Sequence, residues 1–286
     1  MTSVADLKPR SLILDLFGEY LRFTSTGTRL SHLTTLLETF EVAPATVRVT
    51  ISRLRREGWF VNERSGRETR YQLTDGMRRL LEEGRQRIFA PPPTTWPGEW
   101  TMVTYQLTEA ERHERDQLKK DLAWHGFGPL STSTWLAPGD RRPIARELLQ
   151  NVGAERAEIL RCLSDGLDHD RSLAARCWDL TSLALEYADF NARHEPLIRR
   201  ASGLKGSQAL VARTLLISHY RHFPFRDPQL PPPLKPDGWP GDDAYQIFRT
   251  AHRALGPAAR DFVSEVVGEQ VTDAEAAFEQ VPASRP

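Results

Sequence analysis

Four arginines lie within nine residues near the start of the chain, in the segment TVRVTISRLRREGWFV at 46–61. A guanidinium group can donate two hydrogen bonds at once to a guanine edge or to a phosphate. Such chemistry at this density indicates a nucleic acid as the partner. The alternative is an ordinary solvent-exposed helix face, because runs of charge often serve only to keep a helix in water. The four residues are Arg48, Arg53, Arg55 and Arg56.

The apolar residues of this segment predict a helix that begins near Pro44 and is ended by Gly58. Small and basic residues fall on the face opposite its apolar stripe. There, small side chains permit close approach to base edges, and arginines can bind bases or phosphates. Arg55 falls near the apolar edge, so it is the weakest candidate of the four arginines. The apolar stripe consists of Val47, Ile51 and Leu54.

The flanking elements are those expected of a DNA-binding domain. Apolar stripes predict two earlier helices at 8–23 and 31–40, and Ser31 can cap the second. After the arginine-rich helix, WFVNER and ETRYQL flank a glycine-containing turn at 65–67, which predicts a hairpin, and another helix follows from about Thr74. This order predicts a winged helix-turn-helix, whose arginine-rich helix would enter the major groove. The candidate DNA-binding residues are Thr46, Arg48, Val49, Ser52, Arg53, Arg56, Arg64, Arg67 and Arg70.

Charge is balanced over the 286 residues but not along them. Residues 1–90 contain 15 Lys and Arg against 11 Asp and Glu, whereas the remainder contains 23 against 27. The positive excess therefore coincides with the predicted DNA-binding domain. No apolar run of about 18 residues could span a bilayer, and the N-terminus lacks the apolar segment of a secretory signal. Two cysteines are too few for a disulfide framework, which favours a reducing compartment. Together these features lead us to expect a cytoplasmic protein without a membrane partner.

Proline-rich segments divide the chain into parts. The segment APPPTTWPG cannot continue a helix and predicts a stiff linker. Beyond it, a β-α-β-α-β order suggests a ferredoxin-like domain, with strands at about 100–106, 131–136 and 158–162 and helices at 109–125 and 142–151. From Trp178 onward the pattern is helical, with a proline-rich interruption at 225–241 and a last helix at 242–255. We therefore expect an α+β multidomain chain: a winged helix-turn-helix domain at 1–89, a linker at 90–98, a ferredoxin-like α+β domain at 99–175 and a helical effector or dimerisation region at 176–286.

A second group of polar and aromatic residues that could bind a ligand lies in HYRHFPFRD at 219–227. Its aromatic rings could hold an acyl group while an arginine binds a phosphate or carboxylate of a small-molecule effector. The alternative is a helix end whose aromatics pack and whose Arg226 pairs with an acid. His219 and His222 have a spacing that metal ligands use, but without a nearby Cys or acidic partner we expect no metal. The candidate effector-binding residues are His219, Tyr220, Arg221, Phe225 and Arg226.

Several of these segments resemble one protein family. LKPRSLILDLFGEYL and TVRVTISRLRREGWF resemble the N-terminal domain of the PaaX family of repressors of phenylacetate degradation. WTMVTYQLTEAERHERDQLKKDLAWHGFGPLSTSTWLAP is similar to the family's central segment, and RCWDL with RDPQLPPPLKPDGWPG to its C-terminal signature. The resemblance, which covers nearly the whole chain, implies a repressor of double-stranded operator DNA that is released by phenylacetyl-CoA or another aryl-acyl-CoA. It also implies a homodimer, which is favoured because one winged helix covers too few base pairs to be selective.

The same resemblance raises an enzymatic alternative, because the family's central domain is similar to small CRISPR-associated proteins of nuclease ancestry. Metal-dependent cleavage of a phosphodiester requires a carboxylate at the end of the first strand to hold the cation. The sequence has Gln106 at that place, and Glu109 is more simply a residue that opens a helix. We therefore expect no enzyme activity, no catalytic residues and no cofactor beyond the effector. A scaffold that binds another protein through its helical region is the remaining alternative.

Overall fold

The computed structural model describes residues 7–65, 68–154 and 156–280. Within them, helices combine with two small antiparallel sheets, so the chain is an α+β protein as expected. None of the described helices is both long and apolar enough to cross a membrane.

The described residues form two compact units, each built from separate stretches of the chain. The first unit comprises the N-terminal segment up to Ala90, residues 192–221 and the segment from Tyr245 onward. The second comprises residues 91–191 and 222–244. The helical region that we expected at 176–286 therefore contributes to both units.

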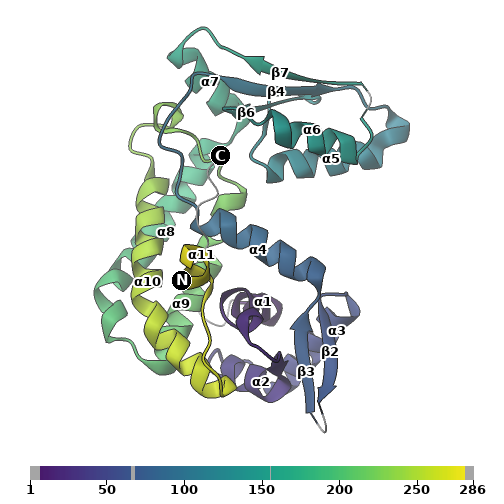
Figure 1. Cartoon of the computed structure of the whole chain (residues 1–286). Helices are drawn as coiled ribbons and strands as arrows, with labels where there is room; N and C mark the ends of the chain where they lie inside the picture. The colour runs from purple at the N-terminus through teal and green to yellow at the C-terminus, as the bar shows by residue number, and fades with distance from the viewer. Residues whose placement is uncertain (1–6, 66–67, 155, 281–286) are drawn as a thin grey trace. The chain divides into compact units, whose positions relative to one another are not determined.

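The N-terminal part of the first unit has the expected order of three helices, a hairpin and a fourth helix (Figure 1). Its strands form an antiparallel sheet in the order β1-β3-β2, in which Phe60 pairs with Leu73 and Glu63 with Arg70. The elements are α1 (Pro9–Glu19), η2 (Leu21–Phe23), β1 (Thr28–Arg29), α2 (Leu30–Glu38), α3 (Pro44–Arg56), β2 (Phe60–Ser65), β3 (Glu68–Leu73) and α4 (Asp75–Phe89).

The limits of α3 have local causes. Pro44 lies in the first turn, where a backbone N–H would have no partner in the helix. At the other end Gly58 adopts a φ of +78°, and its amide donates to the carbonyl of Arg55 at 3.0 Å, which closes the helix. The start of α2 differs from our expectation. That helix begins at Leu30, so Ser31 lies inside its first turn and does not cap it.

The core of the first unit is centred on α1. Its residues Leu12, Ile13, Leu16 and Phe17 are at most 1% exposed. The helix contacts α3, and it also contacts α9 (Gly206–Tyr220) and α11 (Ala274–Gln280) from the other end of the sequence (Figure 1). The N-terminal segment therefore does not complete a core of its own, because C-terminal helices cover part of its apolar surface.

The helix α10 (Pro240–Val267) is longer than the sequence pattern predicts. We expected it to end at Leu255. A proline inside a helix removes one hydrogen bond and crowds the preceding turn. The helix instead continues through Pro257. Ala259 and Val263, which follow the proline, are fully buried. Burial of this apolar face outweighs the local cost of the proline. Two further helices, α8 (Leu180–Arg200) and α9, precede α10 in the chain.

A buried ionic cluster, here called the Arg213 cluster, joins α1 to the C-terminal helices. Arg213 is 1% exposed, and it donates to the hydroxyl of Tyr20 at 2.8 Å and to a carboxylate oxygen of Asp273 at 3.0 Å. Removing a charge from water is unfavourable unless partners compensate it, so each of these contacts matters for stability. The cluster consists of Glu19, Tyr20, Arg213, His252, Asp273 and Glu275.

His252 forms the other half of the Arg213 cluster. Its two ring nitrogens lie 2.8 Å from a carboxylate oxygen of Glu19 and 2.7 Å from one of Glu275. Burial by itself would raise the pKa of Asp273, but the charge of Arg213 and hydrogen bonds lower that pKa to about 2. Burial would likewise lower the pKa of Arg213, and its acidic neighbours raise it instead. The two groups therefore stay charged in the interior.

The second unit contains a four-stranded antiparallel sheet in the order β5-β6-β4-β7. Two helices, α5 and α6, cover one face of it (Figure 1) and bury a core that includes Val103, Leu118 and Trp135. The expected β-α-β-α-β order is present, with β5 as one additional short strand. The elements are β4 (Trp100–Tyr105), η3 (Glu109–Glu111), α5 (Arg112–Trp124), β5 (Gly128–Pro129), β6 (Thr134–Pro138), α6 (Arg142–Asn151), β7 (Ala157–Cys162) and α7 (Leu167–Cys177).

Both proline-rich segments are anchored within the second unit. Trp96 donates from its indole nitrogen to Asp170 of α7 at 3.3 Å, and Trp100 donates to the other oxygen of the same carboxylate at 2.6 Å. In the second segment Leu230 and Leu234 are each 2% exposed. The linker expected at 90–98 is therefore held in place by the side chain of Trp96. Its proline content alone does not predict this contact.

Candidate nucleic-acid interface and effector pocket

The helix α3 exposes a face of small and basic side chains. Val47, Ile51 and Leu54 are at most 1% exposed, which confirms the expected buried stripe. Val49, on the opposite face, is 69% exposed although it is apolar. A short apolar side chain between arginines suits a major groove, where thymine methyl groups offer apolar contacts beside hydrogen-bonding groups. The other exposed candidates on α3 are Thr46, Arg48, Ser52, Arg53 and Arg56.

The candidate arginines of α3 differ in the hydrogen bonds and ion pairs that their side chains form. Arg53 donates from Nε to Glu57 at 2.9 Å, and this hydrogen bond is the largest cause of a lowered pKa of Glu57. The pair is open to water, so a stronger acceptor could replace Glu57. The side chains of Arg48 and Arg56 form neither an ion pair nor a hydrogen bond within the described part of the chain. These two guanidinium groups are therefore the most available to an incoming nucleic acid.

Arg10 of α1 is a neighbour of this face that sequence reasoning missed. It donates to Glu57 at 2.6 Å, and its guanidinium carbon lies 4.3 Å from the ring centre of Trp59. Nothing in the local pattern marks it, because the contact depends on how α1 packs against α3. Arg55, the weakest candidate, approaches Asn62 of β2 at 3.5 Å.

The arginines of the hairpin also separate into different environments. Arg64 on β2 is exposed, and its side chain has no hydrogen-bond partner among the described residues. Arg70 on β3 is half-buried and donates to the hydroxyl of Thr26 at 2.5 Å, so it supports the loop before β1. Arg67 at the hairpin turn lies outside the described residues. A role for these three arginines in DNA binding stays a prediction.

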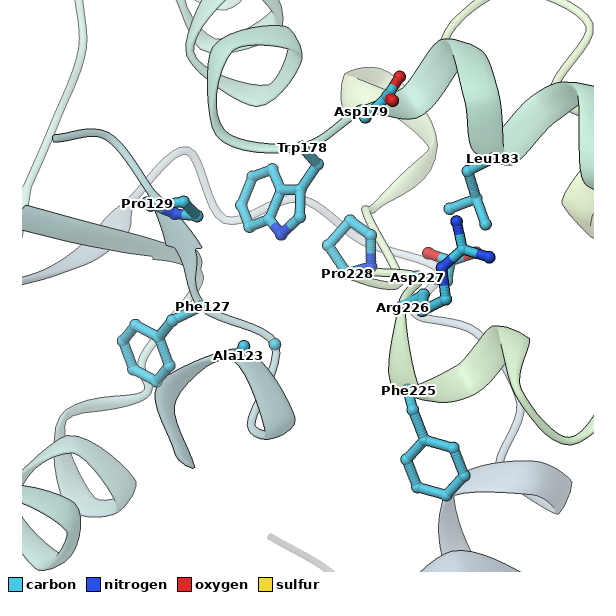
Figure 2. Close-up of a pocket in the computed structure, with 11 residues that line it drawn as sticks. Ala123, Phe127, Pro129, Trp178, Asp179, Leu183, Phe225, Arg226, Asp227 and Pro228 are labelled. Atoms are coloured by element: carbon cyan, nitrogen blue, oxygen red, sulfur yellow. The ribbon is translucent and has the colours of Figure 1, made fainter. Parts of the chain in front are cut away.

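The second unit contains a pocket of about 290 Å³ (Figure 2). Its wall is mostly apolar and combines α5, the turn before β5, α8 and the segment after η5 (Phe223–Phe225). Polar side chains from Asp179, Arg226 and Asp227 lie along one side. A largely apolar cavity with a few polar groups at its edge is the usual form of a small-molecule site. The apolar lining residues are Ala123, Phe127, Pro129, Trp178, Leu183, Phe225 and Pro228.

The polar groups of this pocket are held in place by neighbours. Arg226 forms a bidentate ion pair with Glu186, one of whose two contacts is 2.8 Å, and its side chain remains 50% exposed. Asp227 accepts from the hydroxyl of Tyr187 at 2.8 Å and from the amide of Gln229 at 2.6 Å. Burial is the main cause of its raised pKa. Arg226 thus pairs with an acid, as our structural alternative for this segment expected, and it also borders the pocket.

Trp178 is a pocket residue to which sequence reasoning assigned no role, although it lies in the RCWDL motif. Its indole packs against β5 at Gly128, where an added Cβ atom would be 2.5 Å from the ring and 2.8 Å from the Cβ of Cys177. The Trp178 ring also stacks on Trp100, with 6.4 Å between ring centres. A glycine on the adjacent strand is therefore needed for this wall of the pocket to form.

The structure divides the predicted effector-binding residues between the two units. Phe225 and Arg226 line the pocket of the second unit. Tyr220 is 4% exposed in the first unit, where its ring stacks on Phe248 with 4.0 Å between centres. His219 and Arg221 belong to the first unit as well. Only two of the five candidates therefore border this cavity.

A pair of histidines occupies the region where we considered a metal site. Nε2 of His194 lies 2.9 Å from Nδ1 of His219 within the first unit. Burial, with a smaller effect of His219, lowers the pKa of His194 to about 3, so this ring is neutral at ordinary pH. His222 belongs to the second unit and faces Glu186 at 3.9 Å. No group of three or more His, Cys, Asp and Glu among the described residues could hold a metal ion.

Arg221 forms an ion pair with Asp15 of α1 at 2.9 Å. Burial raises the pKa of Asp15 to about 6, and Arg221 acts in the opposite direction. The folded chain therefore binds this proton more tightly than the unfolded chain, and the contribution of Asp15 to the free energy of unfolding decreases as the pH rises from about 4 to 6. We expect Asp15→Asn to raise the free energy of unfolding by about 1 to 2 kcal/mol near pH 7 and to change it little below about pH 4.

Urea denaturation of the Asp15→Asn variant over this pH range tests the expectation. Asp261→Asn removes an exposed carboxylate from α10 and serves as the control, for which we expect the wild-type pH profile. A variant less stable than the wild type near pH 7 would mean that the ion pair with Arg221 outweighs the burial of the charge.

Three consecutive parts of the chain match the parts of a single protein family. Residues 8–77 match the PaaX-like protein family, residues 93–174 the PaaX protein central Cas2-like domain, and residues 178–265 the PaaX-like protein C-terminal domain. The chain is also 31% identical over 266 residues to the transcriptional repressor PaaX of Escherichia coli strain K12, in a match that covers 89% of this chain and 83% of that protein. The chain belongs to the PaaX family.

One solved structure resembles this PaaX-family chain along its length. It is that of the uncharacterized protein Rv0674 from Mycobacterium tuberculosis, with a TM-score of 0.54 over 95% of this chain and 99% of that one. The two sequences are 20% identical, so the likeness concerns the fold alone.

The central PaaX domain is the part that raised the enzymatic alternative. At the end of its first strand, Gln106 is an exposed neutral amide. Glu109 is 74% exposed, and its carboxylate pairs with Arg115 at 3.1 Å and with Arg112 at 3.7 Å. The carboxylate of Glu109 is therefore engaged by arginines of the following helix.

Proposed function

We propose that this PaaX-family chain is a transcriptional repressor that binds double-stranded operator DNA through a winged helix-turn-helix. In this proposal α3 enters the major groove and the β2–β3 hairpin contacts the adjacent backbone. The exposed face of α3 carries the proposal, because Arg48 and Arg56 are available and the central Val49 faces solvent. The description of the Escherichia coli relative as a transcriptional repressor supports the same direction of regulation.

The repressor acts as a homodimer in this proposal. Two copies would place their α3 helices in successive major grooves, about 34–36 Å apart along the DNA, and would therefore read a palindrome-like site. The second unit has the β-α-β-β-α-β order of a ferredoxin-like domain, which supports that assignment for the central part of the chain. The surfaces outside α3 and the hairpin would form the contact between copies.

The effector in this proposal is an aryl-acyl-CoA such as phenylacetyl-CoA, and its acyl end enters the pocket of the second unit. The volume of about 290 Å³ is near the lower limit for small-molecule sites, so it suits an aryl group and not a whole acyl-CoA. Phe127 and Phe225 offer ring contacts, and the half-exposed Arg226 can meet a phosphate or carboxylate. Binding would favour a dimer arrangement that no longer fits the operator, which requires a coupling of only about 1 to 3 kcal/mol.

A gel shift on the chain's own upstream DNA, titrated with aryl-CoA esters and with the free acids, tests both halves of the proposal. We expect a discrete protein–DNA complex. An aryl-CoA ester should dissociate this complex, and the free acid should not. Failure to bind this DNA at low salt would contradict the DNA-binding half. Binding that no ester or acid changes would contradict the effector half and leave the DNA half intact.

Filling the pocket is expected to separate the two activities. Ala123 is exposed at the pocket, so Ala123→Trp places an indole in the cavity without disturbing the core of α5. We expect this variant to bind DNA like the wild type and to require at least about 10-fold more ester for release, because the site is occupied. Ala175→Trp adds the same ring at an exposed position of α7 and is the matched control. Equal ester sensitivity of the two variants, measured by the same gel shift, would place the effector elsewhere.

A further inference from the structure

A second, smaller pocket lies in the first unit, between the end of α1 and strand β3. Its volume is about 100 Å³. Apolar side chains such as Phe17 and Tyr71 form one part of the lining, and Arg22, Arg78 and Ser25 form a polar part. It is smaller than the roughly 150 Å³ cavity that accepts a benzene ring, so it does not suit an aromatic effector.

The polar part of this pocket contains a guanidinium group that the protein itself leaves incompletely bonded. The side chain of Arg22 is only 4% exposed. Its Nε and Nη2 atoms are buried and have no hydrogen-bond partner among the described residues. The remaining nitrogen, Nη1, reaches Glu82 only at 3.4 Å. A buried cation with unsatisfied donors is unfavourable, so a ligand that accepts those hydrogen bonds would gain their full value.

The carboxylate that Arg22 reaches, Glu82, is already committed to other residues. Arg85 donates to both oxygens of Glu82, in one case at 2.9 Å, and Gln86 donates to it at 3.1 Å. Arg78 adds another positive charge at the pocket. The pKa of Arg22 is lowered, chiefly by burial; Arg85 and Arg78 act in the same direction, and Glu82 and Glu19 act in the opposite direction. Among the residues that line the cavity itself, Arg22 and Arg78 are cationic and none is acidic, whereas Glu82 and Glu269 bond residues at its edge.

The loop that closes the pocket is fixed by specific contacts. Ser25 donates from its backbone amide and from its hydroxyl to Glu269, at 3.1 and 2.5 Å. Gly27 has a φ of +76°, and a Cβ atom there would lie 2.8 Å from the side chain of Gln72 and 3.1 Å from the carbonyl of Tyr71. A glycine at this position therefore lets the loop approach β3 closely enough to form the cavity.

We propose that this pocket is a binding site for one oxyanion of the phosphate class, held by Arg22 and Arg78. A guanidinium group donates two parallel hydrogen bonds to two oxygens of such an anion, and the two unsatisfied nitrogens of Arg22 are on the same planar group. The anion is either a free phosphate or a phosphate of the DNA backbone. The assignment does not depend on the proposed repressor function, because it follows from the cavity and its charges.

Isothermal titration of inorganic phosphate into the full chain, in a low-salt buffer without phosphate, tests the site. We expect one phosphate per chain with a Kd of about 1 mM or tighter. Arg22→Met keeps the length of the side chain and removes its donors, and we expect at least about 10-fold weaker binding. Arg78→Gln should weaken binding about 3-fold or more, since one charged hydrogen bond is lost. Arg79→Gln, an exposed neighbour outside the pocket, should bind phosphate like the wild type.

The site is refuted if the wild type shows no saturable phosphate binding up to about 10 mM, or if Arg22→Met and Arg79→Gln bind phosphate equally. Circular dichroism confirms that each variant is folded. If Arg22→Met does not fold, the comparison of Arg78→Gln with Arg79→Gln decides, because both positions are exposed and an equal affinity would contradict the site.

A repeat of the titration on protein saturated with its upstream DNA identifies the source of the phosphate. If DNA supplies it, the complex takes up no inorganic phosphate, and Arg22→Met lowers the slope of the salt dependence of DNA binding by about one. If the ligand is free phosphate, the complex binds it as before. If the chain binds phosphate but no DNA, the proposed repressor function is contradicted and the phosphate site is still supported.

Discussion

Replacing Arg53 and Arg56 together by alanine is expected to weaken binding of the chain's upstream DNA by about 2 to 6 kcal/mol, because each arginine is assigned a base or phosphate contact worth about 1 to 3 kcal/mol. Both side chains are on the exposed face of α3. Arg56 is available as it stands, whereas Arg53 must leave Glu57. We therefore expect Arg56→Ala alone to have the larger effect of the two single variants.

Salt dependence distinguishes what each arginine contacts. If Arg56 contacts a phosphate, its loss should lower the slope of log affinity against log salt by about one and affect all sequences equally. If it reads a base, the slope should change less, and discrimination at one position of the operator should decrease. Filter binding at several salt concentrations, on the upstream fragment and on an unrelated fragment, measures both quantities.

The control for this double variant removes the same charge elsewhere. Arg79 of α4 and Arg146 of α6 are exposed and lie outside the predicted interface. Arg79→Ala combined with Arg146→Ala should keep DNA affinity within about 0.5 kcal/mol of the wild type, as surface substitutions generally do. If this control loses as much affinity as the α3 variant, general positive charge and not the α3 face governs DNA binding.

The second large effect is expected in stability. Arg213→Ala should lower the free energy of unfolding by about 3 to 5 kcal/mol, because it leaves the carboxylates of a buried cluster without their cation. Asp273, which accepts from Arg213 at 3.0 Å, is 1% exposed and would lose its main compensating charge. Arg260 at 2.9 Å would compensate only in part, since it also faces solvent. Such a loss is a large share of the stability of a typical domain.

Urea denaturation followed by circular dichroism and by tryptophan fluorescence measures this loss. Arg199→Ala on the exposed surface of α8 is the control, for which we expect a change within about 0.5 kcal/mol. Hydrogen exchange adds a structural readout. Since Arg213 bonds Tyr20, which directly follows α1, amides of α1 should lose protection together with those of α9 to α11. Loss of less than about 1 kcal/mol would show that the buried charges are satisfied in another way.

Local pattern was sufficient for elements whose signals lie within a few residues. The helix at 142–151 has the observed limits, and the apolar stripe of α3 is buried as expected. These features depend on side-chain periodicity, a proline in the first turn and a glycine at the end, which act over one or two turns. For the same reason the outward face of α3, with Arg48, Val49 and Arg56, could be chosen from the sequence.

Features that depend on distant partners could not be predicted in this way. The helix α10 continues past Pro257 because residues beyond it are buried, and no local rule contains that information. Strand β5 has two residues, too few to show a period. Trp96 docks onto Asp170, which lies 74 positions away. The role of the proline-rich segment therefore depends on a contact that its composition does not reveal.

The sequence by itself determined which helix faces are apolar, where the hairpin forms, and that arginines gather on the exposed side of α3, because each follows from periodicity and turn chemistry over short distances. Only the tertiary structure decided that α1 shares its core with C-terminal helices, through an arginine 193 positions from Tyr20. It also decided that Phe225 and Arg226 border one cavity while Tyr220 and Arg221 pack in another unit. The physical reason is the same in each case. Burial and charge compensation depend on which surfaces meet, and residues far apart in the sequence supply the two sides.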